Sequence, residues 1–290
     1  MGGGFILPCR MKMILRILMT VAVVVVVPLV VLVACQSKMI YLPRPYPGNP
    51  PMLPESFLKA GGREIEIRTG EGRQVGWLRL PAGGKPERFW IVCGGNGTLA
   101  LELAGHFPES DATRDAWLFF DYPGYGYCQG KPSPMTIGES LRAVVPAALA
   151  ECGMTPEDLP ERGIVLGHSL GAAVALMAAD AFEIRRAVLI SPFTSTPDMA
   201  RKMLGLPVGW LVTHRFDNRA MLDCLVERGG RAWIIHGKAD RIIPVTMGRE
   251  LAAAHPDKIR FFEIPNAGHN DIFQRADSEF HTATAEARNP

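Results

Sequence analysis

The sequence predicts an α/β fold built on a mostly parallel sheet of eight strands. Short apolar runs bounded by turn residues alternate with helical stretches from about residue 60 to residue 280. The most specific turn is Gly167-His168-Ser169-Leu170-Gly171, which follows the apolar run 163–166 and opens a helix of small residues. Strand, G-x-S-x-G and helix form the context of a nucleophile elbow, whose sharp turn lifts a serine hydroxyl clear of the sheet. Glycine is expected on both flanks because a Cβ there would collide with a neighbouring strand or helix.

Each expected strand is a short apolar run, and each expected helix follows one. The predicted strands cover residues 63–68, 75–80, 88–92, 116–120, 163–166, a run ending at Ser191, 231–237 and 259–264. The predicted helices cover residues 98–104, 136–151, 170–180, 244–254 and 270–280, on both faces of the sheet. The stretch 191–230 is short, which predicts a small lid and an open site. Its apolar residues either pack on the core or form a wall for an acyl chain.

Residues downstream of the elbow supply the partners that a nucleophilic serine needs. A serine hydroxyl becomes reactive when a base takes its proton, and an acid must hold that base in one tautomer. Asp240 follows the run 231–237 and His269 follows the run 259–264, at strand ends where open α/β sheets bind ligands. Ser169, Asp240 and His269 are therefore the predicted nucleophile, acid and base. Asp198, which also follows a strand end, is the alternative acid.

A tetrahedral intermediate also needs backbone amides that point at its oxyanion. The residue after the nucleophile, Leu170, supplies one of them. The glycine-rich loop after the strand 88–92 supplies the other, with the amide of Asn96 preferred and that of Gly97 next. Glycines in this loop allow the backbone to approach a substrate closely.

Several motifs in the correct order resemble the α/β-hydrolase superfamily over about residues 60 to 280. The run 94–97 is similar to H-G-N-A of the small, membrane-anchored serine hydrolases called serine-aminopeptidase-like, a group that includes acyl-protein thioesterases. That group's motifs D-Y-x-G-Y-G-x-S-x-G-x-P-S, S-P-F-T-S and H-G-x-x-D-x-x-x-P correspond to residues 121–133, 191–195 and 236–244. The resemblance implies an α/β-hydrolase fold. Gly94 in place of the family histidine and Cys128 in place of a serine depart from the pattern.

The glycine-rich loop also supports an alternative from another class. The run Gly95 to Ala100 fits G-x-G-x-x-A between a strand and a helix, and the next strand ends at Asp121, where a dinucleotide-binding domain would hold a ribose. That interpretation leaves Ser169, Asp240 and His269 without a role, and two strands precede the motif, which is unusual for such domains. The hydrolase interpretation is preferred, and Asp121 is then expected to hydrogen-bond its own turn.

The N-terminal 34 residues predict a signal peptide or a membrane anchor. Arg10, Lys12 and Arg16 precede an uncharged apolar run, 17–34, that is long enough to span a bilayer. The run ends in Leu32-Val33-Ala34-Cys35, which looks like the lipobox of bacterial lipoproteins and favours cleavage before a lipidated Cys35. An uncleaved transmembrane anchor is the alternative. Either arrangement places the domain 60–290 outside the cytoplasm, because the basic flank stays inside.

Residues 35–59 form a proline-rich tether, expected to run extended or to pack along the domain surface. Three of the 31 lysines and arginines fall in the first 34 residues, which leaves 28 basic against 29 acidic residues. No basic run stands out, so nucleic acid is not an expected partner. The motifs indicate no cofactor and no metal, since C-x-x-C and H-E-x-x-H are missing from the sequence. Disulfides among Cys93, Cys128, Cys152 and Cys224 are open, with three connectivities.

These observations together predict a membrane-tethered serine hydrolase that cleaves a carboxylic ester or thioester through an acyl-enzyme. An aminopeptidase or amidase that uses the same triad is the nearest alternative. A lipoprotein with a hydrolase fold but no catalytic activity is a further one, which an intact Ser-Asp-His set disfavours. The substrate is expected to be a small molecule or an acylated one.

Overall fold

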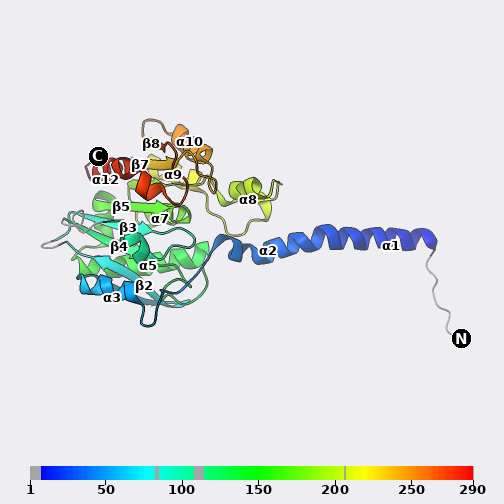
Figure 1. Cartoon of the computed structure of the whole chain (residues 1–290), viewed down its shortest axis with the longest axis horizontal. Helices are drawn as coiled ribbons and strands as arrows, with labels where there is room; N and C mark the ends of the chain where they lie inside the picture. Colours follow the sequence, from blue (N-terminus) through cyan, green and yellow to red (C-terminus); the bar gives the residue numbers. More distant parts are fainter. Residues whose placement is uncertain (1–7, 82–84, 108–113, 206, 290) are drawn as a thin grey trace.

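The computed structural model describes residues 8–81, 85–107, 114–205 and 207–289, and an eight-stranded sheet forms its centre (Figure 1). The strands are β1 (Arg63–Thr69), β2 (Gly72–Arg79), β3 (Arg88–Cys93), β4 (Asp115–Phe120), β5 (Gly163–His168), β6 (Arg186–Ile190), β7 (Arg231–Gly237) and β8 (Ile259–Ile264). Their order is β1-β2-β4-β3-β5-β6-β7-β8. β1 and β2 pair antiparallel, β2 is antiparallel to β4, and all other neighbours are parallel. The predicted mostly parallel, eight-stranded sheet is therefore confirmed.

The central strands β4, β5 and β6 are buried along their whole length, which is why each reads as a continuous apolar run. Helices cover both faces of the sheet. One face carries α5 (Pro134–Glu151), α7 (Leu170–Ala181), α9 (Asn218–Glu227) and α10 (Val245–Ala254). The other carries α3 (Met52–Lys59), α4 (Ala100–Ala104) and α12 (Asp277–Arg288), and α11 (Ile272–Arg275) precedes α12. The short helices η3 (Pro156–Asp158) and α6 (Leu159–Arg162) lead into β5.

Helix α5 shows how local sequence sets these elements. The Ser133 hydroxyl accepts a hydrogen bond of 3.1 Å from the amide of Thr136, and Pro134 occupies the first helical position, where its missing N–H is harmless. Helix α7 follows Ser169 and consists almost entirely of small and aliphatic residues, which allows it to pack closely on β3 and β5. The strand β5 and the helix α7 therefore hold the predicted nucleophile between two buried elements.

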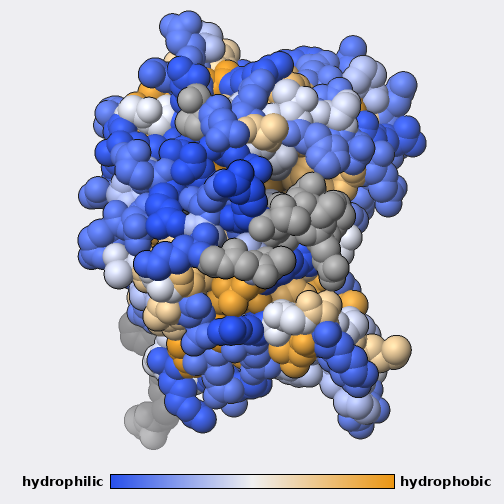
Figure 2. All heavy atoms as spheres, turned by 90° about the vertical axis from the view of Figure 1, so that its left-hand side faces the viewer, coloured by the Kyte–Doolittle hydropathy of each residue, from blue (hydrophilic) through white to orange (hydrophobic). Residues whose placement is uncertain are grey.

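A long apolar helix extends from the domain at the N-terminal end of the described chain (Figure 1). It consists of α1 (Cys9–Val21), a π-helical turn η1 (Ala22–Val26) and α2 (Val27–Ile40). Among the described residues this 32-residue stretch alone is long and apolar enough to cross a bilayer, and its most apolar 18-residue window has a mean hydropathy of 3.2. The first seven residues of the predicted signal segment 1–34 lie outside the described chain. Figure 2, which views the domain from the side opposite the helix, shows a mostly hydrophilic face.

The proline-rich segment after this helix packs on the domain. Tyr41 and Tyr46 are buried, and residues 52–59 form the helix α3 instead of extended chain. Phe57 on α3 packs edge-on against Trp77 of β2. Residues 35–40 of the predicted tether continue the helix α2, and the rest of the range 35–59 packs along the domain surface instead of forming a free extended tether.

The stretch between β6 and β7 forms a small cap, α8 (Thr196–Leu204) and η4 (Gly209–Leu211), followed by α9. Phe216 and Leu222 are buried in the core, whereas Met203 and Trp210 are exposed. Some apolar residues of this stretch therefore pack on the core as expected, and others remain at the surface; the alternative role as a wall for an acyl chain stays a prediction. All six cysteines are free thiols.

Candidate active site

Ser169 occupies a strained turn between β5 and α7. Its backbone has φ 57° and ψ −120°, a conformation that side chains rarely adopt without support from their surroundings. A Cβ on Gly167 would lie 2.0 Å from the carbonyl oxygen of Gly171, and one on Gly171 would lie 2.1 Å from that of Cys93. The two flanking glycines are therefore required by close backbone contacts, as the sequence predicts for a nucleophile elbow.

Asp240 and His269 meet past the ends of β7 and β8. Asp240 Oδ2 accepts a hydrogen bond of 2.7 Å from His269 Nδ1. The other carboxylate oxygen accepts bonds of 2.9 and 2.8 Å from the amides of Ile242 and Ile243. Because Nδ1 carries the proton that Asp240 accepts, His269 Nε2 is left with a free lone pair. That is the tautomer that a general base requires.

The carboxylate of Asp240 is held in its charged form. Burial alone would raise its pKa, but the nearby His236 ring and the hydrogen bonds from His269 and the amide of Ile243 outweigh burial and lower the pKa well below its usual value. Asp240 therefore stays an anion that orients the imidazole beside it. The Oγ of Ser169 forms no hydrogen bond within the described part of the chain, and such contacts are often long in free enzymes and shorten when substrate binds.

Asp198, the alternative acid, serves another site. It lies in the first turn of α8. Its Oδ2 accepts a hydrogen bond of 2.7 Å from the Thr194 hydroxyl and forms an ion pair with Arg219 at 2.7 Å. Arg201 also pairs with it. These contacts anchor the start of the cap, and His269 contacts Asp240 instead.

The loop after β3 lies against the elbow. A Cβ on Gly95 would be 3.5 Å from Cβ of Ser169. The amide of Asn96 donates no hydrogen bond within the described residues, nor does that of Leu170, the first residue of α7. Both predicted donors are thus free to bind an oxyanion, and Gly97 is the next residue of the same loop.

Two tyrosines hydrogen-bond to the carbonyls of this loop. Neither has a role predicted from the sequence. Tyr122 donates a hydrogen bond of 2.6 Å to the carbonyl oxygen of Gly94, and Tyr125 donates one of 2.7 Å to that of Asn96. The segment after the N-terminal helix completes the support, because the amide of Leu42 also donates to the Asn96 carbonyl at 2.9 Å. Arg44 Nε donates to the carbonyl of Gly97 at 2.8 Å. Hydrogen bonds therefore hold the carbonyls of Gly94, Asn96 and Gly97, while the amide of Asn96 donates none within the described residues.

Asp121 is structural, but its partners lie outside its own turn. The carboxylate accepts hydrogen bonds of 2.9 Å from Trp77 Nε1 and from the amide of Ala100, and a third from the Tyr46 hydroxyl. Asp121 is buried, and these three donors occupy both of its oxygens. It is therefore not placed to bind a ribose, and the dinucleotide alternative loses its acidic residue.

Two histidines next to the predicted triad received no role from the sequence, although each stands inside a recognised motif, His168 in the elbow and His236 at the start of residues 236–244. His168 precedes the nucleophile, and its Nε2 donates to the carbonyl oxygen of His269 at 3.2 Å. Burial, and then the electrostatic effect of His269, lower the pKa of His168 to about 3, so the ring is neutral at physiological pH. His236 Nε2 donates to the carbonyl of Ile243 at 2.9 Å and lies 3.6 Å from Asp240 Oδ2. Each ring lies beside a member of the predicted triad: His168 beside His269, and His236 beside Asp240.

The comparison with known families agrees with this architecture. A model of the alpha/beta hydrolase family matches residues 81–227, just over half of the chain. The chain belongs to this family. The uncharacterised protein Rv2307c of Mycobacterium tuberculosis is 31% identical over 245 residues, which cover 81% of either chain. Alpha/beta hydrolase domain-containing protein 17C of Xenopus tropicalis is 30% identical over 156 residues, 53% of this chain and 46% of that protein.

Solved structures share the fold at lower identity. An esterase from Pyrococcus furiosus superposes with a TM-score of 0.59 at 21% identity, covering 85% of this chain and 96% of the esterase. An α/β serine hydrolase without a lid from Xanthomonas campestris superposes with a TM-score of 0.53 at 17% identity, covering 78% and 93%. The chain is thus an alpha/beta hydrolase whose structural neighbours include esterases.

Proposed function

We propose that this chain is a serine hydrolase that cleaves a carboxylic ester or thioester through an acyl-enzyme. The hydrogen bond of 2.7 Å between His269 Nδ1 and Asp240, beyond an elbow that carries Ser169 at a positive φ, is the observation that carries the proposal. In this mechanism His269 Nε2 takes the Ser169 proton as the hydroxyl attacks the acyl carbon, and later gives it to the leaving group. Water then releases the acyl group by the same steps.

The amides of Asn96 and Leu170 stabilise the oxyanion that forms in each step. Free donors at fixed positions stabilise developing charge without the reorganisation that water would need. The hydrogen bonds from Tyr122 and Tyr125 to the loop carbonyls supply that fixed position. The amide of Gly97 is the second choice in the same loop.

An ester or thioester is preferred to an amide as the substrate. The Pyrococcus furiosus relative is an esterase by its name, and its fold extends over most of this chain. An amidase or aminopeptidase would use the same three side chains, so the leaving group is decided by assay. The proposed substrate is a small or acylated molecule, and the reaction as proposed needs no cofactor.

We further propose that the N-terminal helix tethers the domain 60–290 to a membrane, outside the cytoplasm. The helix runs unbroken through Cys35 to Ile40, and the buried side chain of Gln36 bonds to the cap, which supports an anchor that is retained. The motif Leu32-Val33-Ala34-Cys35 supports the other arrangement, in which residues 1–34 are removed and Cys35 carries a lipid. Mass spectrometry of the membrane-extracted protein distinguishes the two.

A fluorophosphonate probe and a substrate panel test the proposal. The probe is expected to label the wild type once, at Ser169, and not to label Ser169→Ala. In the panel, p-nitrophenyl esters and acyl thioesters are expected to turn over faster than aminoacyl anilides, and Ser169→Ala should lower kcat by roughly 10⁴- to 10⁶-fold. Faster anilide cleavage would identify an amidase. A folded wild type that neither reacts with the probe nor hydrolyses any member would be a hydrolase fold without this chemistry.

A further inference from the structure

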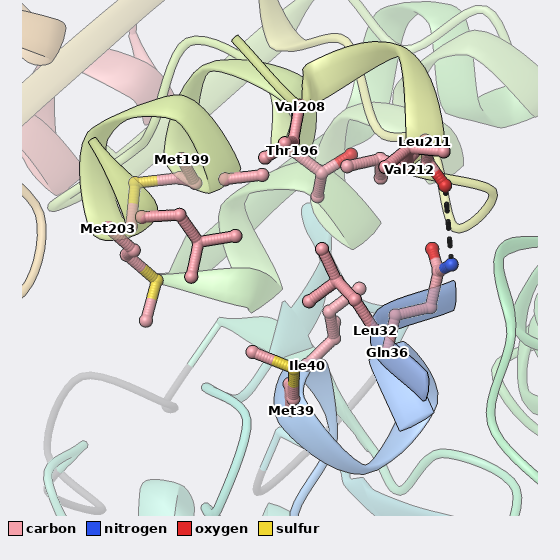
Figure 3. A pocket seen from close by; sticks show the side chains of 12 residues that line it. Leu32, Gln36, Met39, Ile40, Thr196, Met199, Met203, Val208, Leu211 and Val212 are labelled. Atoms are coloured by element: carbon pink, nitrogen blue, oxygen red, sulfur yellow. Dashed lines mark hydrogen bonds between the residues drawn. The ribbon is translucent and has the colours of Figure 1, made fainter. Parts of the chain in front are cut away.

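An apolar pocket lies between the N-terminal helix and the cap (Figure 3). It holds about 100 Å³ of space that a water molecule can enter, inside a wider hollow that is open to solvent. Side chains from the two elements point at one another across it, and nearly all are hydrocarbon or thioether. They include Leu32 from α2, and Met199 and Ala200 from the cap.

The helix wall of this pocket is fixed to the cap by a buried amide. Gln36 Oε1 accepts a hydrogen bond of 2.6 Å from the amide of Thr213, and its Nε2 donates to the carbonyl of Leu211 at 3.4 Å. Gln36 is only 8% exposed. A buried amide with satisfied donors and acceptors specifies one arrangement of its neighbours. The pocket is thus a built feature of the chain, with one wall supplied by the helix proposed to enter the membrane.

The surroundings of the pocket are suited to a lipid surface. Trp210 of η4 is 70% exposed and Met203 of α8 is 68% exposed, although both are large and apolar. A second apolar hollow lies between Trp210 and the helix residues Val30 and Val33. Tryptophan at such a position is typical of a membrane–water interface. The same cap therefore offers apolar contacts to the bilayer beside the mouth of the pocket.

The pocket also lies on the catalytic side of the sheet. Thr196, one of its lining residues, is in the segment that follows β6. The last residue of β6, Ile190, pairs with His168 and accepts a hydrogen bond of 2.9 Å from the amide of Ser169. The carboxyl ends of β5 and β6 thus carry the nucleophile and the pocket segment side by side.

We propose that this pocket binds the acyl chain of a substrate presented by the membrane, and that the chain's own N-terminal helix forms part of the acyl-binding wall. The inference rests on the proposed function and names its substrate class, a long-chain acyl ester or thioester. A long apolar chain gains free energy for each methylene that it moves out of water. A short acyl group would leave the pocket empty.

Filling the pocket from either wall tests this inference in the full-length, membrane-extracted protein. The measured quantity is the ratio of kcat/KM for p-nitrophenyl laurate to that for p-nitrophenyl acetate. Ala200→Phe on the cap and Leu32→Phe on the helix are each expected to lower the ratio about tenfold or more, because they occupy space meant for the chain. Met199→Ala, which enlarges the pocket, should move the preferred ester towards longer chains.

Matched controls place the same side chain just outside the pocket. Lys202→Phe on α8 and Val31→Phe on α2 lie on the same helices but do not line the cavity, and both should keep the wild-type ratio. If Ala200→Phe hydrolyses both esters with an unchanged ratio, the pocket does not bind the acyl chain. The proposed serine-hydrolase function would not be affected by that result. If Ala200→Phe lowers the ratio but Leu32→Phe leaves it unchanged, the cap lines the acyl-binding pocket and the N-terminal helix does not. A wild type that hydrolyses no ester would overturn the proposed function itself.

Discussion

The phenol of Tyr125 donates a hydrogen bond of 2.7 Å to the carbonyl oxygen of Asn96, the residue whose amide is proposed to bind the oxyanion. The same oxygen of Tyr125 accepts a bond of 2.9 Å from the amide of Leu42. One side chain therefore joins the candidate oxyanion loop to the segment that leaves the N-terminal helix. Burial raises the pKa of Tyr125 to about 12, so the phenol keeps its proton at physiological pH.

Replacing Tyr125 by Phe should affect kcat more than KM. The loop loses one of the bonds that fix the Asn96 peptide, and a misplaced oxyanion donor weakens transition-state binding in particular. We expect kcat to fall about tenfold with KM within about twofold. Tyr127→Phe, whose hydroxyl forms no hydrogen bond in the described structure, is the matched control. Equal kinetics in the two variants would show that Tyr125 does not position the loop.

Conservative substitutions distinguish the two candidate acids, Asp240 and Asp198. Asp240→Asn should preserve the fold but leave His269 in the wrong tautomer, which lowers kcat by about 10⁴-fold. Asp198→Asn weakens contacts with Thr194 and Arg219 and should change kcat by less than about tenfold. Esterase assays, with circular dichroism to verify folding, measure both. If Asp240→Asn keeps a nearly normal kcat and Asp198→Asn is inactive, Asp198 is the acid and the assignment is reversed.

The buried His168 should make the fold sensitive to mild acid. Its pKa is lowered from 6.5 to about 3 in the folded protein, so the unfolded chain binds a proton more readily across that range. Stability is therefore complete above pH 6.5 and falls as the pH drops towards 3, by up to about 1.4 kcal/mol per pH unit. His168→Gln should lose less stability between pH 7.5 and pH 5 in thermal melts. The exposed His281→Gln serves as the control, and equal pH slopes in all three proteins would refute the assignment.

The state of Cys35 is a further measurable outcome. With the helix retained, mass spectrometry of the membrane-extracted protein should find the apolar segment 9–40 intact. A diacylglyceryl or triacyl Cys35 at the N-terminus would instead establish the lipoprotein, and Leu32 would then be absent from the mature protein. Cys35→Ser is the control, since it should leave membrane attachment unchanged when the helix is the anchor.

Local signals made most of the fold predictable. The elbow, the strands that precede Asp240 and His269, and helix α5 all depend on short patterns, and the structure places each within a few residues of its expected range. Helix α3 was missed because prolines dominate its surroundings. Its own Pro54 falls in the first turn, where a missing N–H is tolerated, so the helix forms despite the composition.

The supports of the site could not be predicted in the same way. Tyr125 and Asn96 are 29 residues apart, and Gln36 and Thr213 are 177 apart, so neither pair has a spacing that reveals it. His168 stands within the elbow motif, yet its contact with His269 depends on how two loops at neighbouring strand ends fold together. Such contacts follow from the tertiary packing, and only a structure displays them.

The segment between the helix and the domain has a final consequence. The helix α2 ends at Ile40, and Leu42 is already bonded to Asn96. With that helix retained in a bilayer, Tyr41 alone would separate its last residue from the segment bonded to the domain, so the domain would stay close to the membrane surface. Ser169 would then lie within a narrow range of heights above the headgroups. The enzyme would then select substrates by the distance of their scissile bond from the membrane surface as well as by their chemistry. A bond held at a different distance would not reach Ser169.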